Sequence, residues 1–147
     1  MKTWQKVLLI LLIPLVAIAG VWFGMAHAAP ELPASLAPVV DKAKKQGRKL
    51  VLLLTGSDWC PACQQLEKDI LTTPEWKTFI SGEVLLEVFD YPADRTAPTP
   101  AHEDLRKLRG FRGYPTFVVS DASGKLLALR DGTDVTTADL ITWIRSL

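Results

Sequence analysis

The two cysteines are the residues of this chain whose spacing most clearly indicates chemistry. Cys60 and Cys63 lie in the run Gly-Ser-Asp-Trp-Cys-Pro-Ala-Cys at residues 56–63, and the sequence of 147 residues contains no other cysteine. Two thiols this close together cannot close a long loop, and a structural zinc site takes about four cysteine or histidine ligands. They can form and break a disulfide with each other. We therefore interpret the pair as a redox centre at the junction of a strand and a helix.

Disulfide exchange needs a thiolate, and the residues around the pair offer a way to form one. A free cysteine has a pKa of about 8.5, so only a few per cent is ionised at neutral pH. If Pro61 is the first helical residue, a position that proline favours, Cys60 is the N-cap. Its sulfur would then face the free N–H groups of Ala62 and Cys63 and the positive end of the helix dipole. Cys63 would turn inward, where it can resolve a mixed disulfide formed at Cys60.

The N-terminal residues have the layout of an export signal. Two lysines precede an apolar stretch over residues 7–25, and small residues at 26–28 offer a cleavage site after Ala28. A signal core has about 7 to 15 apolar residues and roughly 20 span a bilayer, so an uncleaved anchor is the open alternative. The rest of the chain is expected in the periplasm, soluble after cleavage near Ala28 or anchored to the inner membrane by residues 7–25. Exported proteins rarely leave paired thiols idle, which disfavours reading the cysteines as inert core residues.

The charge of the chain argues against nucleic acid as a partner. The formal net charge is +1, and removal of residues 1–28 takes away Lys2 and Lys6 and no acidic residue, which leaves +1 − 2 = −1. A nucleic-acid-binding domain needs a strongly basic face. We therefore expect no nucleic acid among the partners.

The remaining chain is predicted to be a short linker followed by one domain. Residues 29–34, with two prolines, read as the linker, and residues 35–147 as the domain. Hydrophobic spacing and turn residues predict helices over residues 35–46, 61–71, 75–80 and 101–108, a final helix capped by Thr136 or Thr137, and strands over residues 49–55, 83–90, 116–120 and 125–130. This order predicts an α/β domain with a mixed central sheet of about four strands flanked by helices.

Two motifs in this arrangement resemble those of the thioredoxin superfamily. The run Trp-Cys-Pro-Ala-Cys at residues 59–63, after a buried strand and before a helix, is similar to the superfamily's active-site turn. The run Gly-Tyr-Pro-Thr at residues 113–116 is similar to the cis-proline loop that faces this turn. The resemblance covers roughly residues 35–147, and the run at residues 55–60 is especially similar to exported bacterial thioredoxin-like proteins. A thioredoxin-like fold is expected.

The resemblance also implies an activity and a set of site residues. It implies a thiol–disulfide oxidoreductase in which Cys60 is the nucleophile and Cys63 the resolving thiol, separated by the spacer Pro61 and Ala62. It implies a substrate surface formed by Trp59, the backbone of Tyr114, a cis Pro115, and Gly132 beside the groove. No cofactor beyond the dithiol and no metal are expected. The implied partners are protein thiols and disulfides and a membrane redox partner, and the protein is expected to be a monomer.

Two departures from thioredoxin leave part of the function open. Thioredoxin has Gly-Pro between its cysteines, and because the intervening residues influence the reduction potential, the direction of electron flow is not inherited. Thioredoxin also buries an aspartate where this chain has Leu54. The alternatives are a periplasmic reductant for one pathway, such as cytochrome c maturation, a copper-binding chaperone that joins His102 to the dithiol, and a non-catalytic binding module. We expect His102 to be an exposed helix residue.

Overall fold

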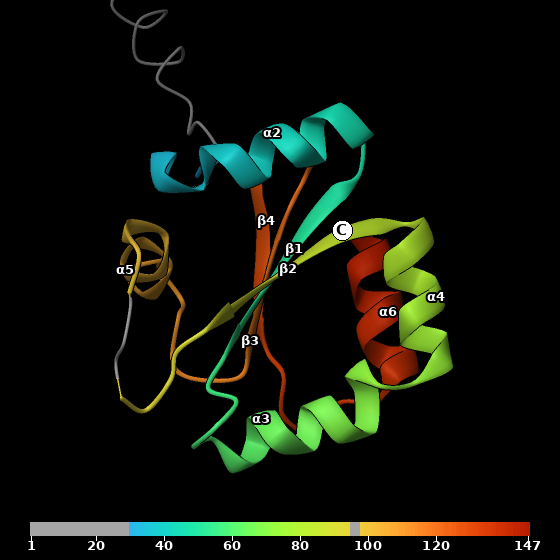
Figure 1. Ribbon diagram of the computed structural model, residues 1–147. Helices are drawn as coiled ribbons and strands as arrows, with labels where there is room; N and C mark the ends of the chain where they lie inside the picture. The colour runs from blue at the N-terminus through green and yellow to red at the C-terminus, as the bar shows by residue number, and fades with distance from the viewer. Residues whose placement is uncertain (1–29, 95–97) are drawn as a thin grey trace, which may run out of the picture.

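The computed structural model describes residues 30–94 and 98–147, which form one mixed sheet with helices on both faces (Figure 1). The elements, in chain order, are η1 (Ala34–Leu36), α2 (Ala37–Gln46), β1 (Lys49–Thr55), α3 (Pro61–Leu66), the π-helical turn η2 (Glu67–Leu71), α4 (Pro74–Gly82), β2 (Val84–Asp90), α5 (Pro100–Arg106), β3 (Thr116–Ser120), β4 (Leu126–Asp131) and α6 (Thr137–Ser146). The predicted export segment lies outside the described residues. Within the described ranges, no helix has the length and apolar character needed to cross a membrane.

The strands follow the order β2-β1-β3-β4. β1 pairs with β2 in parallel, whereas the β1–β3 and β3–β4 pairs are antiparallel. The parallel pair brings the last residues of β1 and β2, Thr55 and Asp90, side by side at one edge of the sheet. The predicted mixed sheet of four strands is confirmed, and the redox motif follows β1 at this edge.

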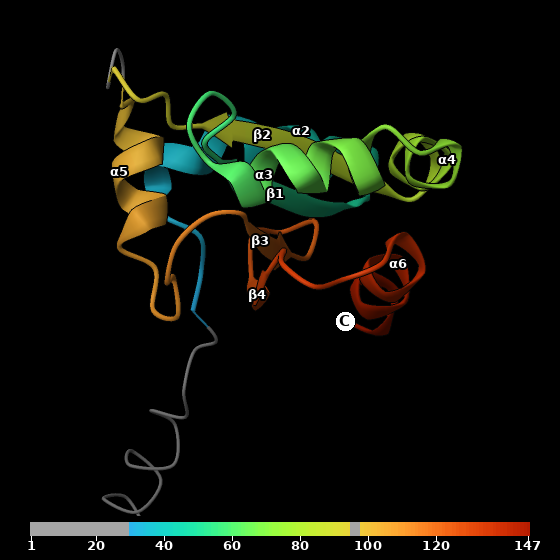
Figure 2. The same ribbon diagram turned by 90° about the horizontal axis from the view of Figure 1, so that it is seen from below.

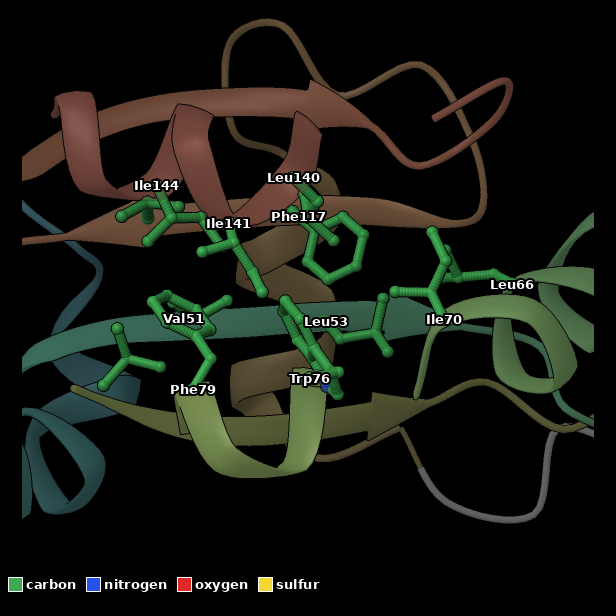
Figure 3. Close-up of a cluster of buried hydrophobic side chains, with 12 residues drawn as sticks. Val51, Leu53, Leu66, Ile70, Trp76, Phe79, Phe117, Leu140, Ile141 and Ile144 are labelled. Carbon is green, nitrogen blue, oxygen red and sulfur yellow. The ribbon is translucent and has the colours of Figure 1, made fainter. Parts of the chain in front are cut away.

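The core has two halves because the side chains of β1 alternate between the faces of the sheet. Val51 and Leu53 belong to the half under α3, α4 and α6, and Figure 3 shows them packed against Trp76, Phe79 and Ile141. The other half, which includes Leu36 and Leu105, lies beneath α2 and α5. Figures 1 and 2 both place α5 on one side of the strands and α4 and α6 on the other. Every residue from Leu50 to Leu54 is buried, as predicted for a strand covered on both faces.

Threonine side chains cap the starts of two helices, and a glycine ends another. Thr73 caps α4 by accepting a hydrogen bond from the Trp76 N–H, and Thr136 forms a capping box with Asp139 at α6. The predicted end of the first helix is confirmed at Gly47, which has a left-handed φ of 63°.

Several predicted boundaries differ by one or two residues from those observed, and three of the helices also differ in their hydrogen bonding. The helix predicted over residues 61–71 changes to a π-helical turn at Glu67, where Thr72 N–H bonds to Glu67 O. The helix predicted to reach Leu108 ends at Arg106, because the Lys107 and Leu108 N–H groups bond three residues back and tighten the last turn. The helix predicted from residue 35 begins with the short turn η1 and then continues as α2.

Part of the segment predicted as a linker packs onto the domain. Leu32 is buried, and its N–H donates to Gly124 O at 2.9 Å. Glu31 forms an isolated antiparallel bridge with Lys125, next to β4. The described chain therefore enters the domain at the end of the β3–β4 hairpin where the two strands are connected. The redox motif lies at the opposite end of these strands, near Thr116.

Candidate active site

Cys60 and Cys63 form a disulfide at the start of α3, with their Cα atoms 5.2 Å apart. Cys60 has an extended backbone conformation and is the N-cap, and Pro61 is the first helical residue. The Cys60 sulfur accepts a hydrogen bond from the Cys63 N–H at 3.2 Å. The predicted N-cap geometry is confirmed, so the helix N-terminus directs an N–H donor at the sulfur predicted to be the nucleophile.

The two sulfurs differ in their surroundings. The Cys60 sulfur lies 3.7 Å from the carbonyl oxygen of Tyr114 and so faces the loop before β3. The Cys63 sulfur accepts the Gly56 N–H at 3.5 Å, inside the turn that leaves β1. Cys60 and Cys63 are 5% and 2% exposed, respectively. Both cysteines are buried, and Cys60 is the slightly more exposed of the two.

The loop that faces the dithiol contains a cis peptide bond between Tyr114 and Pro115, as the resemblance implies. The loop is held to the end of β4, because Gly132 N–H donates to Pro115 O at 3.0 Å. Gly132 is buried, and a methyl group built on it would lie 3.0 Å from the Phe117 ring and 3.1 Å from Pro115 Cγ. The structure therefore brings Gly132 against Pro115, the residue that follows Tyr114 in the loop facing Cys60. Their role in substrate binding remains a prediction.

Trp59 forms the exposed rim of the site, with 46% of its surface accessible. Its indole N–H donates to Tyr91 O at 2.6 Å, and its ring meets the Tyr114 ring edge-on at 5.6 Å between centroids. Beside Trp59 and Tyr114 is a groove of about 560 Å³. The other lining residues are Asp90, Tyr91, Pro92, Ala93, Pro98, His102, Glu103 and Arg106.

An aromatic cluster behind this groove was not predicted from the sequence. The Tyr91 ring contacts the Tyr114 ring in a tilted arrangement and meets the His102 ring edge-on, each at 4.9 Å between centroids, and the Phe111 ring contacts Tyr114 at 5.4 Å. The Tyr91 hydroxyl donates to the carbonyl oxygen of His102, which fastens α5 to the end of β2. Burial raises the pKa of Tyr91 well above its usual range, with a further contribution from Tyr114, and burial likewise raises the pKa of Tyr114. The dithiol follows β1 and Tyr91 directly follows β2. Because these two strands were predicted as a parallel pair, this position could have placed Tyr91 near the dithiol.

Two carboxylates hold the loop that carries Trp59. Asp90 accepts the Ser57 N–H at 2.8 Å and the Ser57 hydroxyl at 2.7 Å. Asp58 accepts the Ala93 N–H with both oxygens, at 3.1 and 3.2 Å. The loop after β1 is therefore fixed to the loop after β2.

The expectation for His102 requires a correction. His102 is half-buried and not exposed, because its ring packs edge-on against Phe89 and Tyr91. Its Nδ1 lies 2.7 Å from the Thr99 hydroxyl. Among residues 30–94 and 98–147, no three His, Cys, Asp or Glu side chains gather in a way that could hold a metal ion.

Comparison with known proteins relates this geometry to a family and to solved structures. The chain matches the family model of the thioredoxin-like domain over residues 36–146. The disulfide bond reductase DsbH of Chlamydia pneumoniae is 30% identical over 97 residues, which cover 64% of this chain and 58% of that protein. A solved DsbH oxidoreductase is 28% identical, with a TM-score of 0.65 over 81% of this chain and 85% of its own. The oxidised C-terminal domain of Neisseria meningitidis DsbD is 27% identical, with a TM-score of 0.59 over 77% of this chain and 93% of that domain.

The curated relatives are longer than the matched region. The alignment covers less than three fifths of DsbH and about one seventh of DsbD from Cronobacter sakazakii, which is called a thiol:disulfide interchange protein. The family match, in contrast, spans all the strands and the whole of the last helix, α6. This chain therefore belongs to the thioredoxin-like domain family.

Proposed function

We propose that this protein is an exported thiol–disulfide oxidoreductase that exchanges disulfides with other proteins, with Cys60 as the nucleophile and Cys63 as the resolving thiol. One observation carries the proposal. The two cysteines are bonded to each other at a helix N-terminus, and the Cys60 sulfur faces the carbonyl of Tyr114, a residue that lines the groove together with Trp59. The names of the similar proteins, a disulfide bond reductase and a thiol:disulfide interchange protein, support the same reading.

The exchange balances with the dithiol alone. In the reducing direction the Cys60 thiolate attacks one sulfur of a partner disulfide, and the other partner sulfur leaves as a thiolate. The Cys63 thiolate then attacks the Cys60 sulfur, so that the Cys60–Cys63 bond forms and the second partner sulfur leaves. Two electrons and two protons pass from the dithiol to the partner. The proposed reaction therefore uses no cofactor or metal.

The surface around Cys60 suggests how a partner polypeptide is held. We propose that an extended segment of the partner pairs with the backbone of Tyr114, as an added strand does. The exposed Trp59 ring and the groove beside it would take the residues that flank the partner's cysteine. Pro115 and Gly132 would shape the floor of this contact, since they hold the loop in place.

We propose the reducing direction, with the dithiol recharged by a membrane redox partner, and a monomeric protein located outside the cytoplasm. The relative named as a disulfide bond reductase supports the reducing direction. The resemblance of residues 55–60 to exported bacterial thioredoxin-like proteins supports the location. N-terminal sequencing of the protein from cell fractions would distinguish cleavage near Ala28 from an anchor at residues 7–25. Light scattering of the protein would test the monomer.

The reduction potential of the Cys60–Cys63 couple tests the direction. The protein is equilibrated with glutathione buffers of graded ratio, and the fraction of dithiol is read by alkylation and mass spectrometry. A reductant should have a potential below about −200 mV, towards the roughly −270 mV of thioredoxin. A value near −120 mV, as in a strong oxidant, would overturn the proposed direction and leave the oxidoreductase assignment to be judged by exchange rates.

A further inference from the structure

Gly56 contacts both cysteines through its own peptide groups. Its N–H donates to the Cys63 sulfur at 3.5 Å, and its carbonyl oxygen accepts the Cys60 N–H at 2.9 Å. The same oxygen accepts the Trp59 N–H at 3.4 Å. One residue between β1 and α3 therefore fixes the backbone of the predicted nucleophile and offers a donor to the predicted resolving sulfur.

Gly56 also provides the space in which the Trp59 indole lies. A methyl group built on Gly56 would be 2.5 Å from Trp59 Cε2 and 2.7 Å from both Cζ2 and Nε1. These are its three nearest neighbours, and real Cβ atoms essentially never approach so closely. Gly56 is absent from the glycines with positive φ, so the backbone conformation does not demand glycine here. The requirement is for space beneath the indole.

The position of the indole matters because it joins the dithiol to the groove. Its N–H donates to the Tyr91 carbonyl and its ring meets the Tyr114 ring edge-on, so a shifted indole would disturb both of these groove-lining residues. The Tyr114 carbonyl in turn contacts the Cys60 sulfur. A side chain at position 56 would thus act on the cysteines through Trp59.

We infer that Gly56 is a positioning residue of the redox centre, which seats Trp59 and holds Cys60 and Cys63 through its peptide groups. The inference rests on the proposed function. During resolution of a mixed disulfide the Cys63 sulfur attacks as a thiolate, and an N–H donor favours the thiolate over the thiol. Leu54 supplies no acid at the position where thioredoxin buries one, and among the described residues the Gly56 N–H is a polar partner of the Cys63 sulfur.

The test is a double-mutant cycle of Gly56→Ala and Trp59→Ala in the full chain. Gly82→Ala is the matched control, because a methyl group there meets nothing within 4 Å. Two readouts are the indole N–H resonance of Trp59 in a protein with ¹⁵N-labelled tryptophan, and the rate at which a mixed disulfide at Cys60 resolves.

In the Trp59 background, Gly56→Ala should move the indole resonance away from its hydrogen-bonded position. It should also slow resolution by about tenfold or more, since misplacement by an ångström can cost about a hundredfold. In the Trp59→Ala background the added methyl has lost its three nearest neighbours, so the same change should alter the rate by less than about twofold. Gly82→Ala should leave both readouts unchanged.

Equal slowing in both backgrounds, or an unchanged indole resonance in Gly56→Ala, would overturn the inference. If Gly56→Ala alone does not fold, the Gly56→Ala/Trp59→Ala protein should fold. Its failure to fold would also contradict the inference that Gly56 makes room for the Trp59 indole. If the wild-type protein shows no exchange, the proposed function fails. The indole resonance, and the folding of the wild type, the two single variants and the double variant, then still decide whether Gly56 positions Trp59.

Discussion

The two hydrogen bonds from Ser57 to Asp90 predict how firmly the active-site loop is held. Asp90 is the last residue of β2, and its two carboxylate oxygens accept the Ser57 N–H at 2.8 Å and the Ser57 hydroxyl at 2.7 Å. Asp90→Ala removes both acceptors, whereas Asp90→Asn keeps one carbonyl oxygen for the N–H. Ser57→Ala removes only the hydroxyl bond.

The size of the effect follows from the kind of bond and its exposure. Hydrogen bonds to charged groups contribute about 1.5–3 kcal/mol, and ordinary ones about 0.5–1.5 kcal/mol. Both bonds are exposed to solvent, so we assign about 1 kcal/mol to each. The free energy of unfolding should therefore fall by about 2 kcal/mol in Asp90→Ala and by about 1 kcal/mol in Asp90→Asn and in Ser57→Ala. Because one bond is shared, the coupling energy between Ser57→Ala and Asp90→Ala should be about 1 kcal/mol.

Urea denaturation of the wild type, the three single variants and the Ser57→Ala/Asp90→Ala protein measures these values. The midpoint should shift with an unchanged m-value, because the surface exposed on unfolding is the same. The exchange rate at Cys60 should also fall in Asp90→Ala, because the loop that carries Trp59 loses its tie to β2. Additive effects of Ser57→Ala and Asp90→Ala, or a wild-type midpoint in Asp90→Ala, would refute this reasoning.

Three further predictions concern the site and its support. The chain has two tyrosines, Tyr91 and Tyr114, and burial raises the pKa of both, so absorbance at 295 nm should show less tyrosinate near pH 10 in the folded protein than in the unfolded protein. Their contribution to stability should be full below the unfolded pKa of about 10 and fall at higher pH, and ordinary titration near pH 10 in the folded state would contradict this. The hydrogen bonds at the α6 cap lower the pKa of Asp139, so the contribution of this carboxylate to stability should be present above about pH 4 and fall in acid. The difference in unfolding free energy between the wild type and Asp139→Asn should therefore shrink in acid. A difference that grows in acid would contradict this prediction. Gly132→Ala should cost about 1–3 kcal/mol of unfolding free energy through overpacking against Phe117, and stability at or above that of the wild type would contradict the contact.

Local signals in the sequence account for what could be predicted. Proline favours the first helical position, which predicts that the residue before it is the N-cap, and the structure places Cys60 and Pro61 in this way. The apolar run from Leu50 to Leu54 likewise specifies a strand covered on both faces.

The groove could not be predicted because its residues are distant in the sequence. Trp59, Tyr91, His102 and Tyr114 come together only through the parallel pairing of β1 and β2 and the docking of α5. Each of them lies in a loop or a short helix, where no periodic pattern marks its neighbours. For this reason the sequence pattern predicts a solvent-exposed His102, although Phe89 in β2 and Tyr91 just after it pack against its ring.

The π-helical turn was missed for a related reason. Leu66 and Ile70 are spaced so that both face inward, and a spacing of four residues suits an α-helix. The wider turn is defined by a backbone hydrogen bond, in which the Thr72 N–H donates to Glu67 O, five residues back. The spacing of the apolar residues does not indicate this bond.

Trapping of the mixed disulfide tests the central claim most directly. Reduced Cys60→Ser and Cys63→Ser proteins are mixed with a disulfide-bonded substrate protein, quenched with acid, and examined by mass spectrometry for covalent adducts. Cys63→Ser should accumulate a one-to-one adduct through Cys60, because the resolving thiol is missing, and Cys60→Ser should form little. An adduct that accumulates through Cys63 in Cys60→Ser, with none in Cys63→Ser, would contradict the assignment of Cys60 as the nucleophile.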